Sequence, residues 1–359
     1  MTTMTTGRRL PPLPTVKDIL RMYRINATKK LSQNFIMDPR LLDRFARLGQ
    51  PQGKLIVEVG PGPGGITRSI LGQGARRCVA IEKDARFLPA LHILNEASGG
   101  RLEVVHGDVM TFNMEKLFPD SNKVDWEGPH PDIEIMGNLP FNVSTPLTIR
   151  WLRAMSERSS LWRYGRVPLT LTYQLEVAQR MAAPPGNTIR SRLSVVCQNW
   201  ARVNLKFTIP GAAFMPKPDV DVAVVTMHPL TVPYIEHPFP LVNKVVSVVF
   251  QGKRKNIKNT IKKLFPETMA EHLSNVILEE TGLKPTQRAI DLDMSDWSRL
   301  CNSYVRILKE NPSLAKYQAR RGDPDLGDMF DDVDGDSDKV VDSDLVTPDT
   351  IQRTIQSGG

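Results

Sequence analysis

Residues 55–65 read LIVEVGPGPGG, and this stretch decides the fold of the first part of the chain. Residues 55–59 are almost all apolar, which predicts a buried strand, and residues 66–71 predict a helix after the glycines. A strand, a glycine-rich turn and a helix in this order are typical of a parallel sheet covered by helices. Gly60 and Gly62 have no Cβ to keep a ligand away, and the start of the helix offers unpaired N–H groups. The turn is therefore either a cofactor site or a tight structural turn.

The spacing of the glycines and of the acids that follow indicates the class of cofactor. The order Gly-Pro-Gly-Pro-Gly-Gly over 60–65 departs from the Gly-x-Gly-x-x-Gly dinucleotide fingerprint, so a turn against an amino-acid tail and a ribose is favoured over a pyrophosphate site. Glu82 ends the next predicted strand, 22 residues after Gly60, where an acid can accept hydrogen bonds from both ribose hydroxyls. Asp108 follows the third strand and can accept from an adenine amino group. Either acid alone would be read as a solvated side chain.

Short β-branched runs alternate with longer helical stretches around this turn, up to residue 229. The predicted strands are 55–59, 78–82, 102–106, 133–136, 169–172, 203–209 and 221–227. The predicted helices are 39–48, 66–71, 85–95, 144–155 and 174–183. The proline-rich residues 210–218 join the last two strands and suit a terminal hairpin. The predicted fold class is therefore α/β, with a mainly parallel sheet that ends in an antiparallel hairpin.

Changes in composition predict four parts of the chain. Residues 1–28 form a targeting or amphipathic segment, in which Thr15 caps a short helix that belongs to the mature protein. Residues 29–229 form the α/β domain. After them the β pattern stops, and residues 230–310 form a small all-α domain, with helices at 241–250, 256–264, 270–281 and 295–308. Residues 311–359, which hold a run of aspartates, are expected to be a disordered acidic tail.

Net charge and cysteine content limit the classes of function. The 359-residue chain carries a net charge of +8, and because residues 311–359 hold five Lys and Arg against eleven Asp, residues 1–310 carry +14. Such an excess indicates a nucleic-acid partner, or else only solubility or the proteome of an organelle. Three scattered cysteines exclude a disulfide framework and a Cys-x-x-Cys metal site. No apolar run is long enough to cross a bilayer, so we expect a soluble monomer in a reducing compartment.

Asn138-Leu139-Pro140-Phe141 follows the fourth predicted strand, at the rim that Glu82 shares. An aromatic amine is a poor nucleophile because its lone pair is delocalised, so a catalyst must accept its hydrogens and hold the nitrogen in line with the carbon that it attacks. The Asn138 side-chain oxygen and the Leu139 carbonyl can accept those hydrogens, and Phe141 can stack on a base. Alone, the tetrapeptide is read as an ordinary proline loop. Together with the glycine turn and Glu82, it predicts methyl transfer to the exocyclic amine of a flipped base.

Several motifs resemble, in order, those of the small-subunit rRNA adenine N6,N6-dimethyltransferases. They are KLSQNF at 30–35, EVGPG at 58–62, GNLPF at 137–141, RLSV at 192–195, FMPKPDVD at 214–221 and QGKRK at 251–255. The resemblance covers residues 15–310. Within the family, GPGPGGITRSIL at 60–71 and the prolines at 11–14 resemble the mitochondrial branch.

The resemblance implies a Rossmann-like methyltransferase fold with S-adenosylmethionine as methyl donor. The implied acceptors are two adjacent adenosines in a hairpin loop near the 3′ end of the small-subunit rRNA, in the mitochondrial matrix, with the assembling small ribosomal subunit as partner. The residues that it assigns to the cofactor are Asn34, Ile36, Gly60, Gly62, Glu82, Lys83, Asp108, Val109 and Asn138. The residues that it assigns to the target base are Asn138, Leu139, Phe141 and Phe214, with the two phenylalanines stacked on either side of the base.

A basic series in the helical domain is the candidate RNA surface, although a solvated helix face is the alternative. Its members are Lys253, Arg254, Lys255, Lys258 and Lys262. The six histidines show no ligand spacing, so no metal is predicted. Two other classes stay open. One is a non-enzymatic mitochondrial transcription or ribosome-assembly factor, with DNA or RNA polymerase as partner; the other is a dinucleotide-dependent oxidoreductase, which the glycine spacing disfavours.

Overall fold

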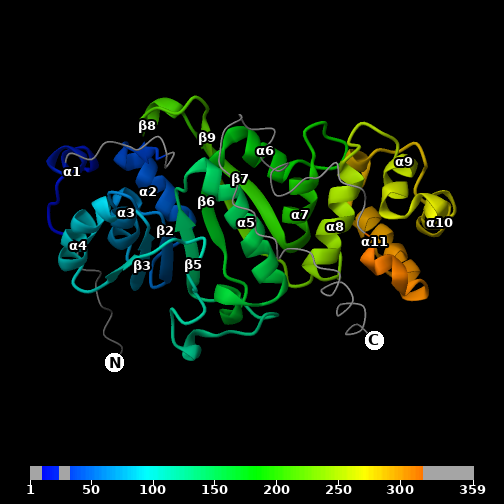
Figure 1. Ribbon diagram of the computed structural model, residues 1–359. Helices are drawn as coiled ribbons and strands as arrows, with labels where there is room; N and C mark the ends of the chain where they lie inside the picture. Colours follow the sequence, from blue (N-terminus) through cyan, green and yellow to red (C-terminus); the bar gives the residue numbers. More distant parts are fainter. Residues whose placement is uncertain (1–9, 24–32, 318–359) are drawn as a thin grey trace. The chain divides into compact units, whose positions relative to one another are not determined.

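The computed structural model describes residues 10–23 and 33–317, and they form two compact units (Figure 1). The first unit holds the residues up to 178 together with 202–231. The second unit holds 179–201 together with the residues from 232 onward. The boundary expected near residue 230 lies beside one of these divisions. Residues 179–201 group with the second unit although they precede the last two strands in the sequence.

The first unit is built on a seven-stranded sheet in the order β4-β3-β2-β5-β6-β9-β7. Its strands are β2 (Leu55–Val59), β3 (Arg77–Glu82), β4 (Leu102–His106), β5 (Ile133–Gly137), β6 (Leu169–Gln174), β7 (Ala201–Ile209) and β9 (Val222–Pro229). The pairs from β4 to β6 are parallel, and β9 is antiparallel to β6. The central strand β2 is buried at every position, which explains its continuous apolar run. The predicted α/β class, with a mainly parallel sheet and an antiparallel end, is confirmed.

Helices α2 (Pro39–Leu48) and α3 (Gly65–Gly72) pack against each other over one face of this sheet. The Asp38 carboxylate accepts a hydrogen bond from the backbone N–H of Arg40 at 2.8 Å, which satisfies one unpaired donor at the start of α2. The fully buried Phe45 joins the core between the helices and the sheet. The predicted start of α2 at Asp38-Pro39 and its end at residue 48 are confirmed.

Helix α1 (Val16–Met22) begins directly after Thr15, as the sequence predicts. The Thr15 hydroxyl oxygen accepts from the Asp18 backbone N–H at 3.2 Å, and the Asp18 carboxylate accepts from the Thr15 backbone N–H at 3.1 Å. Val16 and Leu20 are buried in a small apolar cluster with Phe87. The rest of the predicted segment 1–28, apart from residues 10–15 and Tyr23, lies outside the described residues.

Several elements differ from the predicted ones. Helix α5 (Phe141–Ser156) begins three residues before the predicted start, so Pro140 is its N-cap. The segment 85–95 starts as a 3-10 turn, η2 (Ala85–Phe87), before it continues as α4 (Leu88–Ala97). Two strands were not predicted: β1 (Phe35–Ile36) and β8 (Phe214–Met215) pair antiparallel. Two-residue strands carry no periodic pattern that a sequence can reveal.

The second unit is helical. Its elements are α7 (Arg192–Trp200), α8 (Phe239–Phe250), α9 (Ile257–Ile261), η6 (Lys262–Leu264), α10 (Glu267–Thr281), η7 (Ala289–Asp291), α11 (Met294–Glu310) and η8 (Pro312–Lys316). Helix α6 (Leu175–Ala182) spans the division between the units. The four helices predicted after residue 230 are confirmed, whereas α7 was not predicted.

The predicted acidic tail starts at residue 311, but η8 follows at once and Leu314 within it is buried. Residues 318–359, which include the acidic stretch, lie outside the described residues. In the described part of the chain, no helix is both long and apolar enough to cross a membrane.

Candidate active site

The glycine turn after β2 is held in a backbone conformation that favours glycine. Gly60 has φ +65° and Gly62 has φ +54°. A Cβ on Gly62 would lie 3.0 Å from Cε1 of Phe35, and a Cβ on Gly60 would lie 3.4 Å from Cδ2 of Leu139. The turn thus packs against two segments that are distant in sequence, one on β1 and one after β5. A side chain on Gly62 would push the Phe35 segment away from the turn.

Glu82, at the end of β3, is tied to the same turn. Its Oε2 accepts a hydrogen bond from the Gly62 backbone N–H at 2.8 Å, and its Oε1 accepts from the Asp84 backbone N–H at 2.7 Å. The side chain is only 6% exposed, and this burial raises the pKa of Glu82. Each oxygen keeps a second lone pair, so the carboxylate can still accept hydrogen bonds from a ligand.

The Asn138 carboxamide is held at both ends. Its Nδ2 donates to the backbone carbonyl of Asn34 at 2.8 Å, and its Oδ1 accepts from the Thr172 hydroxyl at 2.7 Å. Thr172 lies on β6 and is fully buried. The backbone carbonyl of Asn34 can only accept, so exchanging the amide oxygen and nitrogen would set two acceptors against each other, and this contact fixes the orientation of the carboxamide. One lone pair of Oδ1 remains for a further donor.

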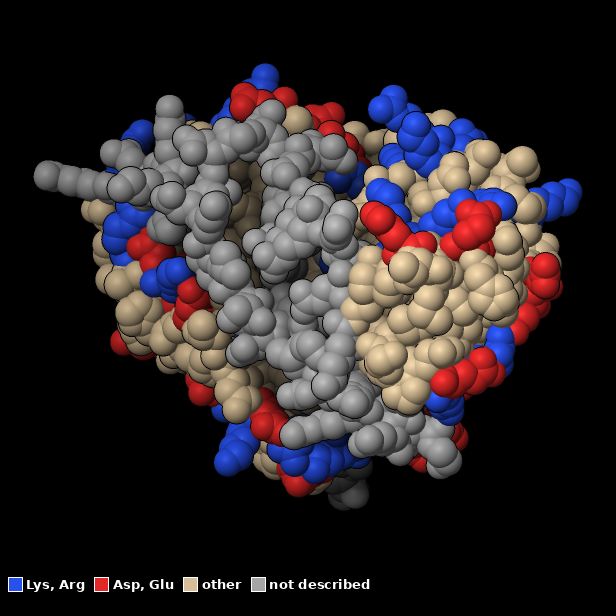
Figure 2. Space-filling view, turned by 45° about the vertical axis from the view of Figure 1, so that its right-hand side comes forward, with Lys and Arg blue, Asp and Glu red and all other residues tan. Residues whose placement is uncertain are grey.

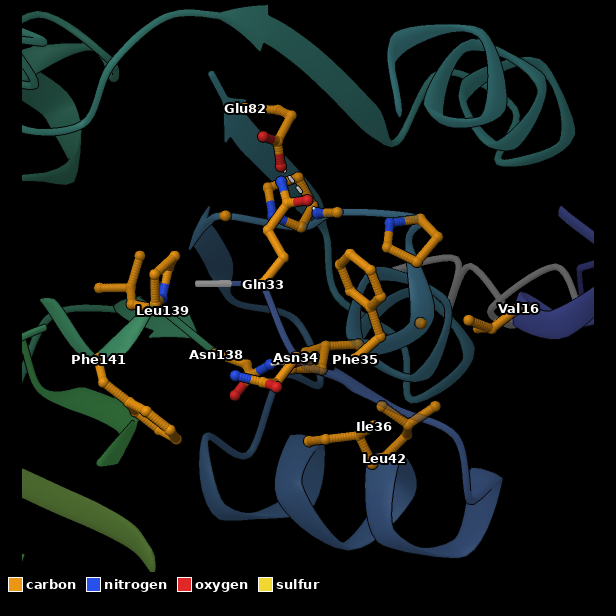
Figure 3. Close-up of a pocket in the computed structure, with 17 residues that line it drawn as sticks. Val16, Gln33, Asn34, Phe35, Ile36, Leu42, Glu82, Asn138, Leu139 and Phe141 are labelled. Atoms are coloured by element: carbon orange, nitrogen blue, oxygen red, sulfur yellow. Dashed lines mark hydrogen bonds between the residues drawn. The ribbon is translucent and has the colours of Figure 1, made fainter. Parts of the chain in front are cut away.

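Glu82, the glycine turn and the Asn138 tetrapeptide line a single cavity (Figure 3). Its empty space, which includes solvent at the open mouth, is about 670 Å³. The predicted site residues that line it are Asn34, Ile36, Gly60, Gly62, Glu82, Asn138, Leu139 and Phe141. The glycine turn, Glu82 and residues 138–141 were expected at one rim because they follow strand ends, and they lie together here; Asn34 and Ile36 were assigned by the resemblance.

Four of the residues assigned to the cofactor or the base do not line this cavity: Lys83, Asp108, Val109 and Phe214. Lys83 and Asp108 form an ion pair, with Nζ 2.7 Å from Oδ2. Burial opposes the ionised form of Asp108, but the hydrogen bonds from Lys83 and the Met110 backbone N–H, together with the charges of Lys83 and Arg150, outweigh it and lower the pKa of Asp108. Val109 is half-buried beside them. The three follow the ends of β3 and β4, next to Glu82, where the Gly107 backbone N–H donates to the Glu82 carbonyl at 2.9 Å.

Phe214, which the resemblance assigns to the base, does not line the cavity. It lies on β8, opposite Ile36 of β1, and is only 5% exposed. Its ring belongs to the main hydrophobic core, together with Leu42 and Phe45. Phe141 packs against the same core, and the stacking of Phe214 on the base stays a prediction.

Several residues of the site were not predicted. The cavity is also lined by Val16 of α1 and by Gln33 and Phe35. The Gln33 Nε2 donates to the Asp84 carboxylate at 2.9 Å, which fastens this segment beside the end of β3. Gln33 and Phe35 are part of the KLSQNF motif, which was the available signal. Thr172 gave no signal, because a threonine in a strand is ordinary.

A second carboxyl group lies beneath the glycine turn. Glu58 on β2 is fully buried, with its Oε2 3.9 Å from the Cys78 Sγ and no hydrogen-bond partner for its Oε1. Burial, with a smaller contribution from Glu82, raises the pKa of Glu58 to about 8. The folded chain therefore binds a proton at neutral pH that the unfolded chain releases.

We expect Glu58→Gln to raise the melting temperature relative to wild type in alkaline solution. The stability that the bound proton supplies is complete below the ordinary pKa of 4.5 and is lost as the pH rises through about 8. Glutamine keeps the shape and needs no proton, so the difference should grow from near zero at acid pH to on the order of 5 °C above pH 8. Thermal unfolding over this pH range measures it. Exposed Glu96→Gln is the control, and an equal pH profile for both variants would contradict the assignment.

The predicted basic series lies in the second unit, on or near α9 and η6. Lys258 and Lys262 both pair with Glu271 of α10, with the Lys258 Nζ 3.0 Å from Oε1. Their hydrogen bonds lower the pKa of the exposed Glu271 carboxyl. Lys253, Arg254 and Lys255 have no ion pair within the described ranges, and the last two are exposed. On the face shown in Figure 2, basic and acidic side chains lie side by side. The series is thus partly neutralised.

Metal ligands and free thiols add nothing to this site. Within residues 10–23 and 33–317, no group of three or more His, Cys, Asp or Glu side chains could hold a metal ion. Cys78, Cys197 and Cys301 are all buried and unbridged.

Comparison with known proteins gives consistent matches along most of the chain. The family model for ribosomal RNA adenine dimethylase matches residues 24–299. The mitochondrial dimethyladenosine transferase 1 of Homo sapiens is 48% identical over 313 residues, which cover 87% of this chain and 90% of that protein. The Xenopus tropicalis protein of the same name is 46% identical with the same coverage, and that of Caenorhabditis elegans is 39% identical over 88% of this chain and 87% of that protein.

Solved structures share the fold. A dimethyladenosine transferase from Plasmodium falciparum matches 76% of this chain and 96% of that chain, with a TM-score of 0.59 and 21% identity. The 23S rRNA methyltransferase ErmE matches 75% of this chain and 98% of that chain, with a TM-score of 0.54 and 21% identity. The chain thus has the Rossmann-like α/β fold of these enzymes followed by a helical region.

Proposed function

The chain belongs to the ribosomal RNA adenine dimethylase family, and we infer that it dimethylates N6 of adenosines in rRNA with S-adenosylmethionine as methyl donor. The observation that carries this function is the single cavity that the glycine turn, Glu82 and Asn138 share. One set of these residues suits a nucleoside cofactor, and the other suits an aromatic amine. Their meeting in one cavity is what methyl transfer between the two ligands requires.

The residues of the cavity fit S-adenosylmethionine. Gly60 and Gly62 leave room at the turn for its amino-acid part, and the free lone pairs of Glu82 can accept from the ribose hydroxyls. We place the adenine toward Lys83, Asp108 and Val109, beyond the end of β3. Asn34 and Ile36 cover the cavity from the β1 side. When bound, the cofactor supplies an electrophilic methyl group on a sulfonium.

The chain's own residues then position the acceptor nitrogen. The remaining lone pair of the Asn138 Oδ1 accepts one hydrogen of the adenine amine, and the Leu139 carbonyl accepts the other, which directs the nitrogen lone pair at the methyl group. Phe141, at the first position of α5, stacks on the base. Transfer of the methyl group would form the nitrogen–carbon bond as the sulfur–carbon bond breaks, and the amine proton held by Asn138 or Leu139 would then become acidic and leave to water. The hydrogen that remains permits a second cycle.

We also propose the substrate and the compartment. Its relatives are named mitochondrial, which supports a mitochondrial protein, and we place it in the matrix. The acceptors are two adjacent adenosines in the 3′-end hairpin loop of the small-subunit rRNA, and the assembling small subunit is the partner. Lys253, Arg254 and Lys255 contact RNA phosphates, with a smaller share for Lys258 and Lys262 because Glu271 neutralises them. The enzyme acts as a monomer.

A labelled methyl group tests this function directly. The full chain is incubated with methyl-labelled S-adenosylmethionine and mitochondrial small-subunit rRNA, and the modified nucleosides are identified after digestion. We expect the label in N6,N6-dimethyladenosine at two neighbouring positions. Label in another nucleoside, or none with RNA that binds, would overturn the proposal and favour a non-enzymatic factor.

Thr172→Val is expected to lower turnover by about tenfold, which corresponds to roughly 1.4 kcal/mol. The valine keeps the volume of the buried threonine but removes the hydroxyl that donates to the Asn138 Oδ1. The carboxamide then loses its fixed orientation, while the cofactor residues are untouched. Single-turnover methylation gives the rate, and the KM for S-adenosylmethionine should stay unchanged.

A structural defect at position 172 would behave differently from a loss of orientation. Thr172→Ser restores the hydroxyl and should recover most of the turnover, although it leaves a small void in the core. Equal rates for the valine and serine variants would contradict the positioning role of Thr172.

A further inference from the structure

Helix α2 carries three arginines on one side. Arg40, Arg44 and Arg47 are spaced by four and three residues, which places them in line on an α-helix, and all three are exposed. The other side of the helix, which includes Phe45 and Ala46, is buried against the sheet. We refer to Arg40, Arg44 and Arg47 as the α2 arginine row.

The row keeps its full charge. None of the three arginines has an ion-pair partner in the part of the chain that the structure describes. Asp43 is the only acid on α2, and its Oδ1 accepts from the Ser69 hydroxyl of α3 at 2.7 Å. In the series of the second unit, by contrast, Glu271 pairs with two lysines. The α2 arginine row, like Lys253, Arg254 and Lys255, is therefore open to a polyanion, and it has this charge within the same unit as the cavity.

Arg44 is held in a way that leaves its donors available. Its guanidinium carbon lies 4.0 Å from the centroid of the Phe207 ring on β7. Such a contact uses the flat face of the guanidinium and leaves the N–H groups at its edge for an oxyanion. Two more exposed cations, Arg202 and Lys206, lie on the same edge strand. The stacking reduces the side-chain freedom that Arg44 would lose on binding a phosphate.

The row starts beside the active-site cavity. Ile36 lines the cavity three residues before α2 begins, and Leu42 on α2 lines it as well (Figure 3). Leu42 is two residues from both Arg40 and Arg44, so it faces the cavity from the side of α2 opposite to the row, and the row borders the cavity only at the start of the helix. Arg40 and Arg47 are about 10 Å apart along the helix axis, so the row extends from the cavity over the length of a few nucleotides.

We propose that the α2 arginine row binds phosphates of the RNA strand that flanks the adenosine in the cavity. The proposal rests on the function stated above and adds to it a surface within the same unit as the cavity. Arginine suits this task because its planar fork matches the oxygens of a phosphate. A membrane surface is disfavoured, since a membrane-bound helix exposes its apolar side, whereas the apolar side of α2 is buried.

The test is the salt dependence of RNA binding by the full chain, measured with a small-subunit rRNA hairpin that includes the loop and its stem. The variant Arg40→Gln/Arg44→Gln/Arg47→Gln should flatten the slope of log affinity against log salt by about two units, at roughly 0.7–0.9 for each phosphate that the protein no longer neutralises. The affinity for S-adenosylmethionine should stay the same. The matched control, Lys116→Gln/Lys123→Gln/Arg153→Gln, removes the same charge elsewhere in the unit and should change the slope by less than about half a unit.

The possible results separate this proposal from the proposed function. Equal slopes for the row variant and the control would overturn the proposal that the α2 arginine row binds RNA, even if the wild-type protein methylates the RNA. If the slope flattens but the wild-type protein does not methylate the RNA, RNA binding by the α2 arginine row is supported and the proposed methyl transfer is overturned. A slope change that appears with duplex DNA but not with RNA would overturn RNA as the ligand. If the triple variant melts early, Arg40→Gln/Arg47→Gln keeps the Arg44 contact with Phe207 and should flatten the slope by about one and a half units.

Discussion

Asn138→Ala is expected to lower the rate of methyl transfer by about 10²–10³-fold while RNA and S-adenosylmethionine still bind. The variant removes the acceptor that directs the amine and frees both the Asn34 carbonyl and the Thr172 hydroxyl from their shared partner. Neither Asn34 nor Thr172 belongs to the glycine turn or is Glu82, so the variant should lose turnover rather than cofactor affinity. Single-turnover assays with labelled methyl groups measure the rate, and calorimetry measures both affinities.

The control for Asn138 is another asparagine without a role in the cavity. Asn259→Ala, an exposed position on α9, should retain the wild-type rate. Turnover by Asn138→Ala within a factor of about three of wild type would remove this residue from the mechanism. A rate loss accompanied by an equal loss of cofactor affinity would instead show that the change collapses the cavity.

Glu82→Ala is expected to weaken the binding of S-adenosylmethionine by about 1–3 kcal/mol, or roughly 5–150-fold. The carboxylate would hold the ribose, and it also accepts from the backbone N–H groups of Gly62 and Asp84. Its removal therefore costs ligand contacts and leaves two backbone donors without an acceptor. Titration calorimetry with the cofactor gives the change, and exposed Glu127→Ala serves as control. Unchanged affinity would place the ribose elsewhere.

The charge of Glu82 adds a pH dependence to the same measurement. The ionised carboxylate is the form that accepts hydrogen bonds from two hydroxyls, and burial raises the pKa of Glu82. Cofactor affinity should therefore fall as the solution is acidified through that raised pKa, at a higher pH than an exposed glutamate would require. The Glu82→Ala variant should lack this fall.

The parts of the site that lie at strand ends could be predicted from the sequence. Parallel strands place their carboxyl ends at one edge, so Glu82 and Asn138 could be assigned to one rim although 56 residues separate them. Thr172 could not be assigned, because its role depends on the register between β5 and β6. Phe214 was assigned to the base by resemblance alone, and since it is buried opposite Ile36 and does not line the cavity, that assignment stays a prediction.

The charge pattern was predictable only in part. A run of lysines and arginines at 253–263 is obvious in the sequence, but Glu271, which pairs with two of them, comes from the next helix. The arginines of α2 are separated by two or three other residues, so they form no run in the sequence. Their alignment becomes visible only when their spacing is placed on a helix. The helix itself was predicted to the residue, because Asp38-Pro39 is a strong start signal.

The position of Val16 links the cavity to the N-terminal part of the chain. Val16 stands in the wall of the cavity, anchored through α1 to the cluster around Phe87. A processing protease that cut after Tyr23 would take α1 away and leave the glycine turn open to solvent, whereas a cut before Thr15 would spare it. A form of the chain that methylates with this cavity must therefore keep α1.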